Sequence, residues 1–342
     1  MNLKYDALLV VSFGGPEGPA DVMPFLENVL RGRNVPRERM LAVAEHYDHF
    51  GGVSPINAQN RALIAALQRE LAANDGPKLP IYFGNRNWHP LLPDTLLQMA
   101  DAGVHRALAF FTSAYSSYSG CRQYRENIAA AREQVGSAAP EIDKLRAFFN
   151  HPGFVEPVTD LLKSSLAQIP ADRRAAAAVV FTAHSIPHAM AATCQFEAQL
   201  LETSRLVAEL AGLTRWQLAY QSRSGPPNQP WLEPDIGVVL RELRTTHGVQ
   251  DAVVVPVGFI SDHIEVLYDL DIEAKQTCDE IGLNMFRCPT VGTHPRFVTM
   301  IRELILERMS DAPQRLTLGR LAPCPDLCPT DCCRYEPRRP VP

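Results

Sequence analysis

Residues 6–18 read DALLVVSFGGPEG, a continuous apolar run that ends in a glycine-rich turn. Parallel strands that are buried on both faces show continuous apolar runs of this kind rather than alternating apolar and polar residues. We therefore predict a buried strand over residues 7–13. Directly after it we predict a turn whose glycines let the backbone lie close to a ligand. The turn lacks the GxGxxG spacing of a dinucleotide site and the lysine of a P-loop, which argues against nucleotide binding.

Five further segments have the same character as the first. The predicted strands are residues 7–13, 80–84, 106–111, 177–183, 216–220 and 251–257. Helical patterns lie between them, for example over residues 57–73, 197–210 and 235–244. Strands that alternate with helices imply right-handed crossovers and an open parallel sheet, so we predict an α/β protein.

The strand–helix pattern runs twice, before and after about residue 145, and a chain of 342 residues is long enough for two domains. We predict two similar Rossmann-like, doubly wound domains, at residues 1–145 and 146–315, with the active-site cleft between them. A tail rich in Pro and Cys follows at residues 316–342. It has no helical or strand period, and we expect it not to pack against the second domain.

Charge and hydropathy exclude several classes of protein. A formal net charge of −5 argues against a nucleic-acid binder, which normally has a basic face. The first apolar run is short and is preceded by Asp6, unlike a signal peptide. No apolar run approaches the roughly 18 residues that a transmembrane segment needs. We predict a soluble, cytoplasmic protein with no transmembrane segment.

The most unusual stretch is FISDHIEVLYDLDIE, residues 259–273. If it is helical from about Asp262, then Glu265, Asp269 and Glu273 fall on one face. Like charges at this spacing destabilise a helix by a few tenths of a kcal/mol per pair, so a stripe of them suits the binding or passage of a cation. The alternative is a solvated acidic face.

His184, in FTAHSIP, follows another predicted strand and would face Glu265 if the two strands are neighbours. An imidazole and a carboxylate together can hold a divalent metal or accept protons near neutral pH, and His263 adds a second nitrogen donor. The alternative for His184 is a purely structural histidine.

The cysteines are unevenly distributed. The chain has 8 of them, and four lie between residues 324 and 333, two of these adjacent. In a reducing compartment, metal ligation explains such a group better than disulfides do.

Together these phrases resemble the ferrochelatase family. The matching segments are SFGGPEG, GGVSPINAQ, GNRNWHP, TSAYSSYSGC, TAHSIP, YQSRSGP and GFISDHIEVLYDLD, in family order from about residue 5 to residue 310. The resemblance implies a porphyrin in the cleft and insertion of Fe²⁺ into it. It also implies that His184 and Glu265 are the catalytic and metal-handling pair, and that Asp269 and Glu273 form an acidic track for the metal.

The same resemblance implies porphyrin contacts at Phe13, Arg31, Ser54 and Tyr124. The phrases SFGGPEG and GNRNWHP resemble the branch that uses coproporphyrin III and makes coproheme for haem biosynthesis. Phe13 departs from this branch, since some of its members have at this position a tyrosine that ligates the product iron. Possible partners include a coproheme decarboxylase.

Some ferrochelatases hold a structural [2Fe–2S] cluster with one internal cysteine and three near the C-terminus. The resemblance assigns these roles to Cys121, Cys328, Cys332 and Cys333, and leaves Cys324 spare. The alternative is a structural zinc, because four thiolates also suit tetrahedral zinc.

Three other functions remain open at this stage. The first is a protoporphyrin IX ferrochelatase, and the second, of another class, is a non-catalytic porphyrin or haem carrier on the same fold. The third is a cobalt chelatase for sirohydrochlorin, a class that lacks the combined HSIP and SDHIE phrases.

Overall fold

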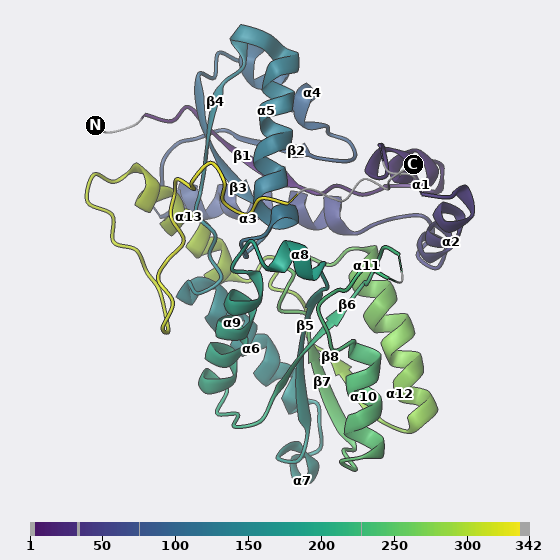
Figure 1. Ribbon diagram of the computed structural model, residues 1–342. Coiled ribbons are helices and arrows are strands. Elements are labelled where there is room, and N and C mark those ends of the chain that lie inside the picture. The colour runs from purple at the N-terminus through teal and green to yellow at the C-terminus, as the bar shows by residue number, and fades with distance from the viewer. Residues whose placement is uncertain (1–3, 33–34, 75, 227, 336–342) are drawn as a thin grey trace.

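A computed structural model describes residues 4–32, 35–74, 76–226 and 228–335 of the chain. Strands and helices alternate along it, and the strands form two four-stranded sheets, one above the other in Figure 1. The predicted α/β fold class is confirmed. Among the residues described, no helix is long and apolar enough to cross a membrane.

The first sheet has the order β2-β1-β3-β4, and all its strand pairs are parallel. Its strands are β1 (Ala7–Ser12), β2 (Ile81–Asn85), β3 (Arg106–Phe111) and β4 (Glu141–Lys144). Every residue of β1 is buried, because neighbours pair with both of its edges and helices cover both faces. A strand in this position needs an apolar residue at nearly every step, which is the physical reason for the run ALLVVS.

The second sheet repeats this topology with the order β6-β5-β7-β8, again all parallel. Its strands are β5 (Ala178–His184), β6 (Gln217–Gln221), β7 (Asp251–Val255) and β8 (Asn284–Arg287). In each half the first strand lies between the second and the third, and the fourth forms an edge. The same strand order in both halves agrees with the predicted repeat.

The six predicted strands correspond to β1, β2, β3, β5, β6 and β7, whereas the edge strands β4 and β8 were not predicted. Both edge strands are only four residues long, with the polar sequences EIDK and NMFR. Their short length and polar side chains leave no continuous apolar run, whereas the other two edge strands, β2 and β6, are each five residues long.

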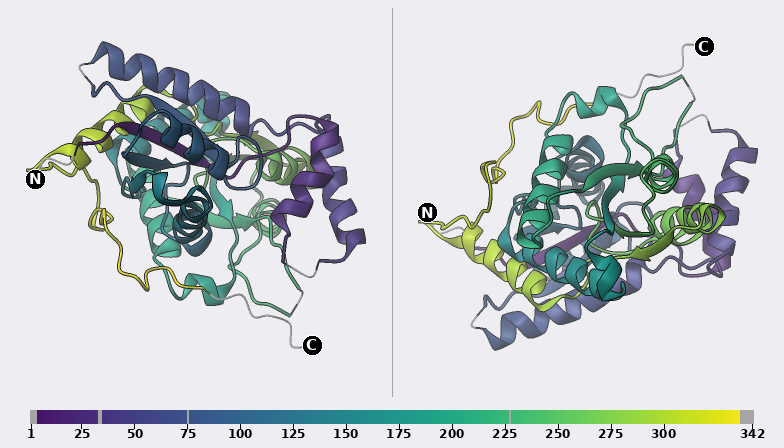
Figure 2. Two further views of the ribbon diagram at one scale, coloured as in Figure 1. Left: turned by 90° about the horizontal axis from the view of Figure 1, so that it is seen from above. Right: turned by 90° about the horizontal axis from the view of Figure 1, so that it is seen from below.

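The helices connect the strands and cover both faces of the sheets (Figure 2). In the first half they are α1 (Pro19–Val29), α2 (Arg37–Asp48), α3 (Ile56–Ala73), α4 (Leu92–Asp101), η1 (Tyr118–Arg122), α5 (Gln123–Val135) and η2 (Gly136–Ala138). In the second half they are α6 (Pro152–Ala167), α7 (Ala171–Arg174), α8 (His188–Ala191), α9 (Phe196–Leu210), α10 (Ile236–Thr245), α11 (Ile264–Val266), η3 (Leu267–Ala274), α12 (Lys275–Ile281) and α13 (Pro295–Met309).

The two halves share one continuous apolar core, which contains side chains of β1 and β3 together with side chains of β5 and β7. Polar contacts also join the halves. The hydroxyl of Tyr115 donates to the carbonyl of Val257 at 2.9 Å, and Arg302 of α13 pairs with Glu70 of α3 at 2.9 Å.

The segment between the halves is held by a buried ion pair. Arg146 donates through two nitrogens to the carboxylate of Glu307, at 2.7 and 3.0 Å, and both side chains are almost fully buried. Arg146 also donates to the carbonyl of Leu316 at 3.0 Å, which fixes the start of the tail. We retain residues 1–145, 146–315 and 316–342 as a proposed division of the chain.

The expectation that the tail would not pack against the second half was wrong. The backbone carbonyl of Asn150 accepts from the amide of Leu318, and the side-chain amide of Asn150 donates to the carbonyl of Leu321. Glu202 of α9 accepts from the amide of Arg320, and Gln199 of the same helix donates to the thiol of Cys324 at 3.4 Å. These are contacts of single residues with the tail backbone or thiol, which a periodic sequence pattern does not reveal.

Candidate functional site

His184 is the last residue of β5 and lies beside Gln221, the last residue of β6, in the register of the two strands. Its Nδ1 is hydrogen-bonded to the carbonyl of Ser185. A carbonyl oxygen can only accept, so Nδ1 carries a proton and the lone pair of the unprotonated ring is on Nε2. The strand end therefore presents Nε2 of His184 as a potential proton acceptor and metal ligand.

The lone pair of His184 faces a carboxylate. Nε2 of His184 lies 3.7 Å from Oε2 of Glu265, and both side chains are partly exposed, by 32% and 55%. This separation is longer than a hydrogen bond, and the unprotonated forms of both groups are acceptors. Two ligands about 2 Å from one ion are about 3 to 4 Å apart, so the geometry suits a cation between them.

His263 is a second imidazole near Glu265. Its Nδ1 is 4.0 Å from the same Oε2 atom, and its ring packs at 5.1 Å from the ring of Phe259. Burial lowers the pKa of His263, which keeps its imidazole neutral at physiological pH. Both imidazoles therefore face the same carboxylate oxygen of Glu265.

The segment that carries Glu265 is not the regular α-helix expected from about Asp262. It begins with one α-turn in α11, continues as the π-helix η3 and returns to an α-helix in α12. π-Helical turns are rare and often occur at functional sites. The acidic side chains are nevertheless close to one another, since the charges of Glu265 and Glu273 both raise the pKa of Asp269.

Asp269 is the most perturbed carboxylate of the stripe. Burial, with the nearby charges of Glu265 and Glu273, raises its pKa to about 7. The hydroxyl of Ser222 donates to it, and the amide of Gln221 lies 3.4 Å from the same oxygen. A cation that approached would favour the ionised form of this carboxyl group.

Gln221 joins the strands to the acidic helix, and it was not among the predicted site residues. It is buried, its Oε1 accepts from Thr182 at 3.0 Å, and its amide reaches the carbonyl of Glu265 at 3.5 Å. On the opposite side of the helix, Arg287 pairs with Asp262 at 3.0 Å and Asp271 at 2.6 Å. The helix is thereby held from two sides.

Three of the predicted porphyrin contacts lie near one another in the first half. The guanidinium of Arg86 lies 5.6 Å from the ring of Phe13 and 4.5 Å from the ring of Tyr124. Arg86 also lines an open groove of about 780 Å³ together with Arg31 and Trp88. Phe13 is 38% exposed, whereas Tyr124 is buried in α5.

Ser54 is also buried, and it packs against the glycine-rich turn. Its amide donates to the carbonyl of Pro16 at 2.8 Å, and a Cβ atom on Gly15 would lie only 2.7 Å from that of Ser54. Gly15 is therefore required for close packing here. The roles of Phe13, Arg31, Ser54 and Tyr124 in porphyrin binding stay predictions.

The four cysteines predicted to hold a cluster are adjacent in space. The thiols of Cys121 and Cys332 are both close enough to the thiol of Cys328 to affect its pKa, and the sulfurs of Cys332 and Cys333 are 3.5 Å apart. The bond from Cys121, with the charges of Lys144 and Arg125, lowers the pKa of Cys328 to about 5. Within the described ranges, no three His, Cys, Asp or Glu side chains are arranged around one metal ion.

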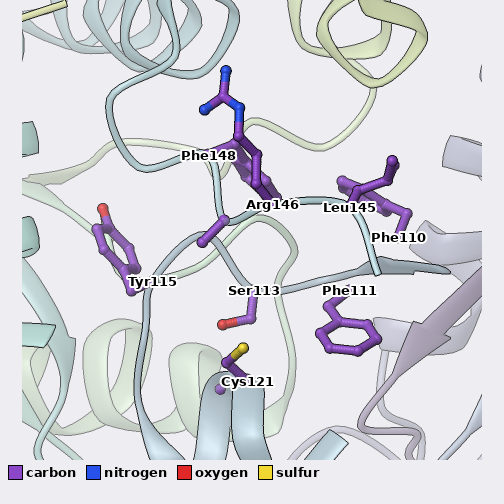
Figure 3. A pocket seen from close by; sticks show the side chains of 10 residues that line it. Phe110, Phe111, Ser113, Tyr115, Cys121, Leu145, Arg146 and Phe148 are labelled. Atoms are coloured by element: carbon purple, nitrogen blue, oxygen red, sulfur yellow. The ribbon is translucent and has the colours of Figure 1, made fainter. Parts of the chain in front are cut away.

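Cys121 is buried where η1 follows β3, beside a cavity of about 10 Å³. Figure 3 shows Cys121 and Ser113 on one side of this cavity and residues of the join, such as Arg146, on the other. Cys324 has different partners, since its sulfur contacts the hydroxyl of Ser116 at 3.5 Å and the amide of Gln199. Cys324 therefore has hydrogen-bond partners other than the four thiols predicted to hold the cluster.

Comparisons with known proteins agree with the resemblance. The family model described as ferrochelatase matches residues 5–309. A ferrochelatase of Rhodopirellula baltica is 59% identical over 98% of this chain and 95% of its own length. A coproporphyrin III ferrochelatase of Streptomyces coelicolor is 52% identical over the same shares. The structure of SirB from Bacillus subtilis with Fe³⁺ is similar in fold, with a TM-score of 0.56, 12% identity and coverage of 90% of this chain and 97% of that one.

Proposed function

The chain belongs to the ferrochelatase family, and from this premise we propose that it is an enzyme that inserts Fe²⁺ into coproporphyrin III to give coproheme. The observation that carries the proposal is the 3.7 Å separation between Nε2 of His184 and Oε2 of Glu265. Insertion removes two pyrrole protons and replaces them with a cation. A neutral imidazole and a carboxylate on one site supply both a proton acceptor and metal ligands.

Each residue of the acidic site has a defined part in this reaction. Nδ1 of His184 is hydrogen-bonded to the carbonyl of Ser185, so the lone pair that is available is on Nε2. His184 therefore accepts a pyrrole proton. Glu265 faces the same point and holds the incoming metal. Asp269 and Glu273 extend the row of carboxylates away from Glu265, and they guide the cation toward Glu265. Gln221 keeps Glu265 and Asp269 in place.

The choice of coproporphyrin III is supported by relatives at 50–53% identity that carry this substrate in their names. The relative at 59% identity is named only as a ferrochelatase. The test is a side-by-side assay of metal insertion into coproporphyrin III and protoporphyrin IX. A higher kcat/KM for coproporphyrin III is expected, and a preference for protoporphyrin IX would refute this assignment. A chain that binds either porphyrin but inserts no metal would be a carrier.

We also propose that Cys121, Cys328, Cys332 and Cys333 hold a structural [2Fe–2S] cluster. A cluster of this type takes four thiolates, two on each iron. Support comes from the pairwise contacts of the four thiols and from the low pKa of Cys328, which favours the thiolate form that ligates metal. The cluster would join η1 to the tail and so contribute to folding stability.

We also propose a compartment and a partner for the enzyme. We place it in the cytoplasm, where its free thiols and the proposed cluster suit a reducing environment. Coproheme retains propionates that protohaem lacks, so an enzyme that decarboxylates them has to follow. A coproheme decarboxylase is therefore a proposed partner.

A further inference from the structure

Two adjacent cysteines of the tail have side chains that face each other. The sulfurs of Cys332 and Cys333 are 3.5 Å apart. In a strand, adjacent side chains point to opposite faces, and on a helix residues i and i+1 do not face each other. Cys333 has neither conformation, because its φ of 54° lies in the left-handed region that a non-glycine residue rarely adopts. The backbone of this turn therefore brings the two thiols together.

Contacts with the first half hold this turn in place. The guanidinium of Arg122, the last residue of η1, donates to the carbonyls of Thr330 and Cys332 at 2.8 and 3.0 Å. The amide of Cys332 donates to the carbonyl of Pro329 at 3.1 Å. These three bonds involve no sulfur atom, so they can hold the turn, and with it the two thiols, without a bound metal.

We propose that Cys332 and Cys333 form a reversible disulfide when the tail holds no metal, and that this disulfide has to be reduced before the four tail-site thiols can hold one. The first part depends only on the positions of the two sulfurs, and the second rests on the proposed cluster site. A disulfide between these residues removes two of the four thiolates that a [2Fe–2S] cluster takes. Disulfides of cytosolic proteins are usually transient or redox-sensing, and a switch of this kind fits that role.

The two thiols differ in accessibility, which sets the order of the steps. Cys332 is partly exposed, whereas Cys333 is buried, so a small disulfide such as oxidised glutathione reaches Cys332 first. The thiolate of Cys332 attacks one sulfur of oxidised glutathione and releases the other half as a thiol. The thiolate of Cys333 then attacks the sulfur of Cys332, closes the disulfide and releases the second glutathione. The two cysteines lose two electrons and two protons, and both leave on two molecules of glutathione thiol.

Adjacency in the sequence makes this disulfide easy to reduce. Neighbouring Cα atoms are about 3.8 Å apart across a trans peptide, which is shorter than the roughly 4.4 to 6.8 Å that ordinary disulfides span. A departure from the ordinary geometry strains the bond and makes it more reducible. Glutathione thiol should therefore reopen the disulfide, so that the modification is reversible in a reducing compartment.

The first test maps the disulfides of the metal-free chain. A chelator and a reductant remove metal and are then themselves removed, oxidised glutathione is added, and the remaining thiols are alkylated. Cleavage after Arg and before Asp isolates residues 331–334, DCCR, from Cys324 and Cys328. We expect this peptide to be lighter by two hydrogen atoms and to carry no alkyl group, and added glutathione thiol should restore two alkylated cysteines.

Several results of this mapping would overturn the disulfide. They are a peptide that joins residues 331–334 to Cys121, Cys194 or Cys328, a peptide that retains glutathione, and a peptide with both cysteines alkylated. Unchanged far-UV circular dichroism after oxidation shows that the folded chain is the one that reacted.

Variants separate the pair from the other thiols. Cys333→Ser should leave Cys332 as a mixed disulfide with glutathione, because the second thiol is missing. Cys324→Ser and Cys194→Ser are the matched controls and should form the disulfide as the wild type does. Cys121→Ser lacks one proposed cluster ligand and should still form it, so the mapping does not depend on the cluster. Loss of the disulfide in either control, or its absence in Cys121→Ser, would contradict the assignment to Cys332 and Cys333.

The second test uses Co²⁺ alone as a probe of the thiol site, since bound thiolates give it a charge-transfer absorption band. The reduced metal-free chain should show this band, and the oxidised chain should lose it until glutathione thiol is added. Equal bands in the two forms, or no band in either, would overturn the second part of the proposal. The iron and sulfide content of the protein purified without oxygen decides the cluster itself, so failure of the cluster and failure of the switch are distinguishable.

Discussion

Nε2 of His184 and Oε2 of Glu265 lie 3.7 Å apart, although one residue ends β5 and the other begins the helix that follows β7. The two strands are neighbours in the second sheet, and parallel strands place their carboxyl ends at the same edge. Topology therefore creates the site, and the side chains at the strand ends determine its chemistry.

The first prediction concerns this pair. His184→Ala and Glu265→Gln should lower kcat for metal insertion by about 10²- to 10⁴-fold, the usual contribution of a general acid or base. Porphyrin affinity should change little, since neither change removes apolar contact with the macrocycle. Fluorescence titration measures binding, and the absorbance of the metalloporphyrin measures insertion. Wild-type rates in both variants would show that the catalytic pair is wrongly assigned.

The second prediction concerns the acidic stripe. Asp269→Asn and Glu273→Gln should raise the KM for Fe²⁺ or Zn²⁺ severalfold and leave porphyrin affinity unchanged, because the carboxylates act on the cation before it reaches Glu265. Asp279→Asn and Glu280→Gln are matched controls, since these carboxylates lie further along the same helix and pair with Lys275 and Arg241. An equal KM for the metal in all four variants would mean that the stripe is only a solvated acidic face.

The sequence revealed those parts of the fold that have a periodic or continuous apolar pattern. The central strands and the helices α3, α9 and α10 were predicted nearly to their ends, because burial on both faces or on one stripe leaves a visible pattern. β4 and β8 lack such a pattern. The contact between Asn150 and the tail depends on single hydrogen bonds, which leave no pattern in the sequence.

Within the site, the same distinction applies. His184 and Glu265 could be predicted because they occur in phrases that resemble a known family. Gln221 lies in one of those phrases too, but its role depends on a hydrogen bond to Asp269 that only the folded chain creates. The ring of His46 stacks on the ring of Tyr268 and so joins segments that are distant in sequence, and no local pattern in either segment indicates this contact.

The third prediction concerns acid stability. His151 is buried, its Nδ1 accepts from the amide of Gly153 at the start of α6, and burial with the nearby charges of Arg146 and Arg296 lowers its pKa to about 3. An unfolded histidine titrates near 6.5, so the unfolded state binds more protons between about pH 3 and pH 6.5. The free energy of unfolding should therefore fall as pH falls through this window, by up to about 5 kcal/mol from this group.

His151→Asn offers a direct test, because asparagine keeps an acceptor at the helix N-cap and does not titrate. Urea unfolding at pH 7.5 and pH 5 should show a smaller loss of stability in this variant than in the wild type. His105→Asn, at an exposed position, should behave like the wild type. Equal losses in all three proteins would mean that His151 is not responsible.

The fourth prediction concerns the cysteines. Protein purified without oxygen should be reddish-brown and contain about two irons and two labile sulfides per chain, as a [2Fe–2S] cluster requires. Cys121→Ser should lose the colour and lower the thermal midpoint, because the ligand from η1 is the only one of the four that lies outside the tail. Cys324→Ser should keep both, since that thiol has Ser116 and Gln199 as its hydrogen-bond partners. A colourless protein with one zinc per chain would preserve the cysteine ligation and refute the cluster. A protein with neither metal would refute both.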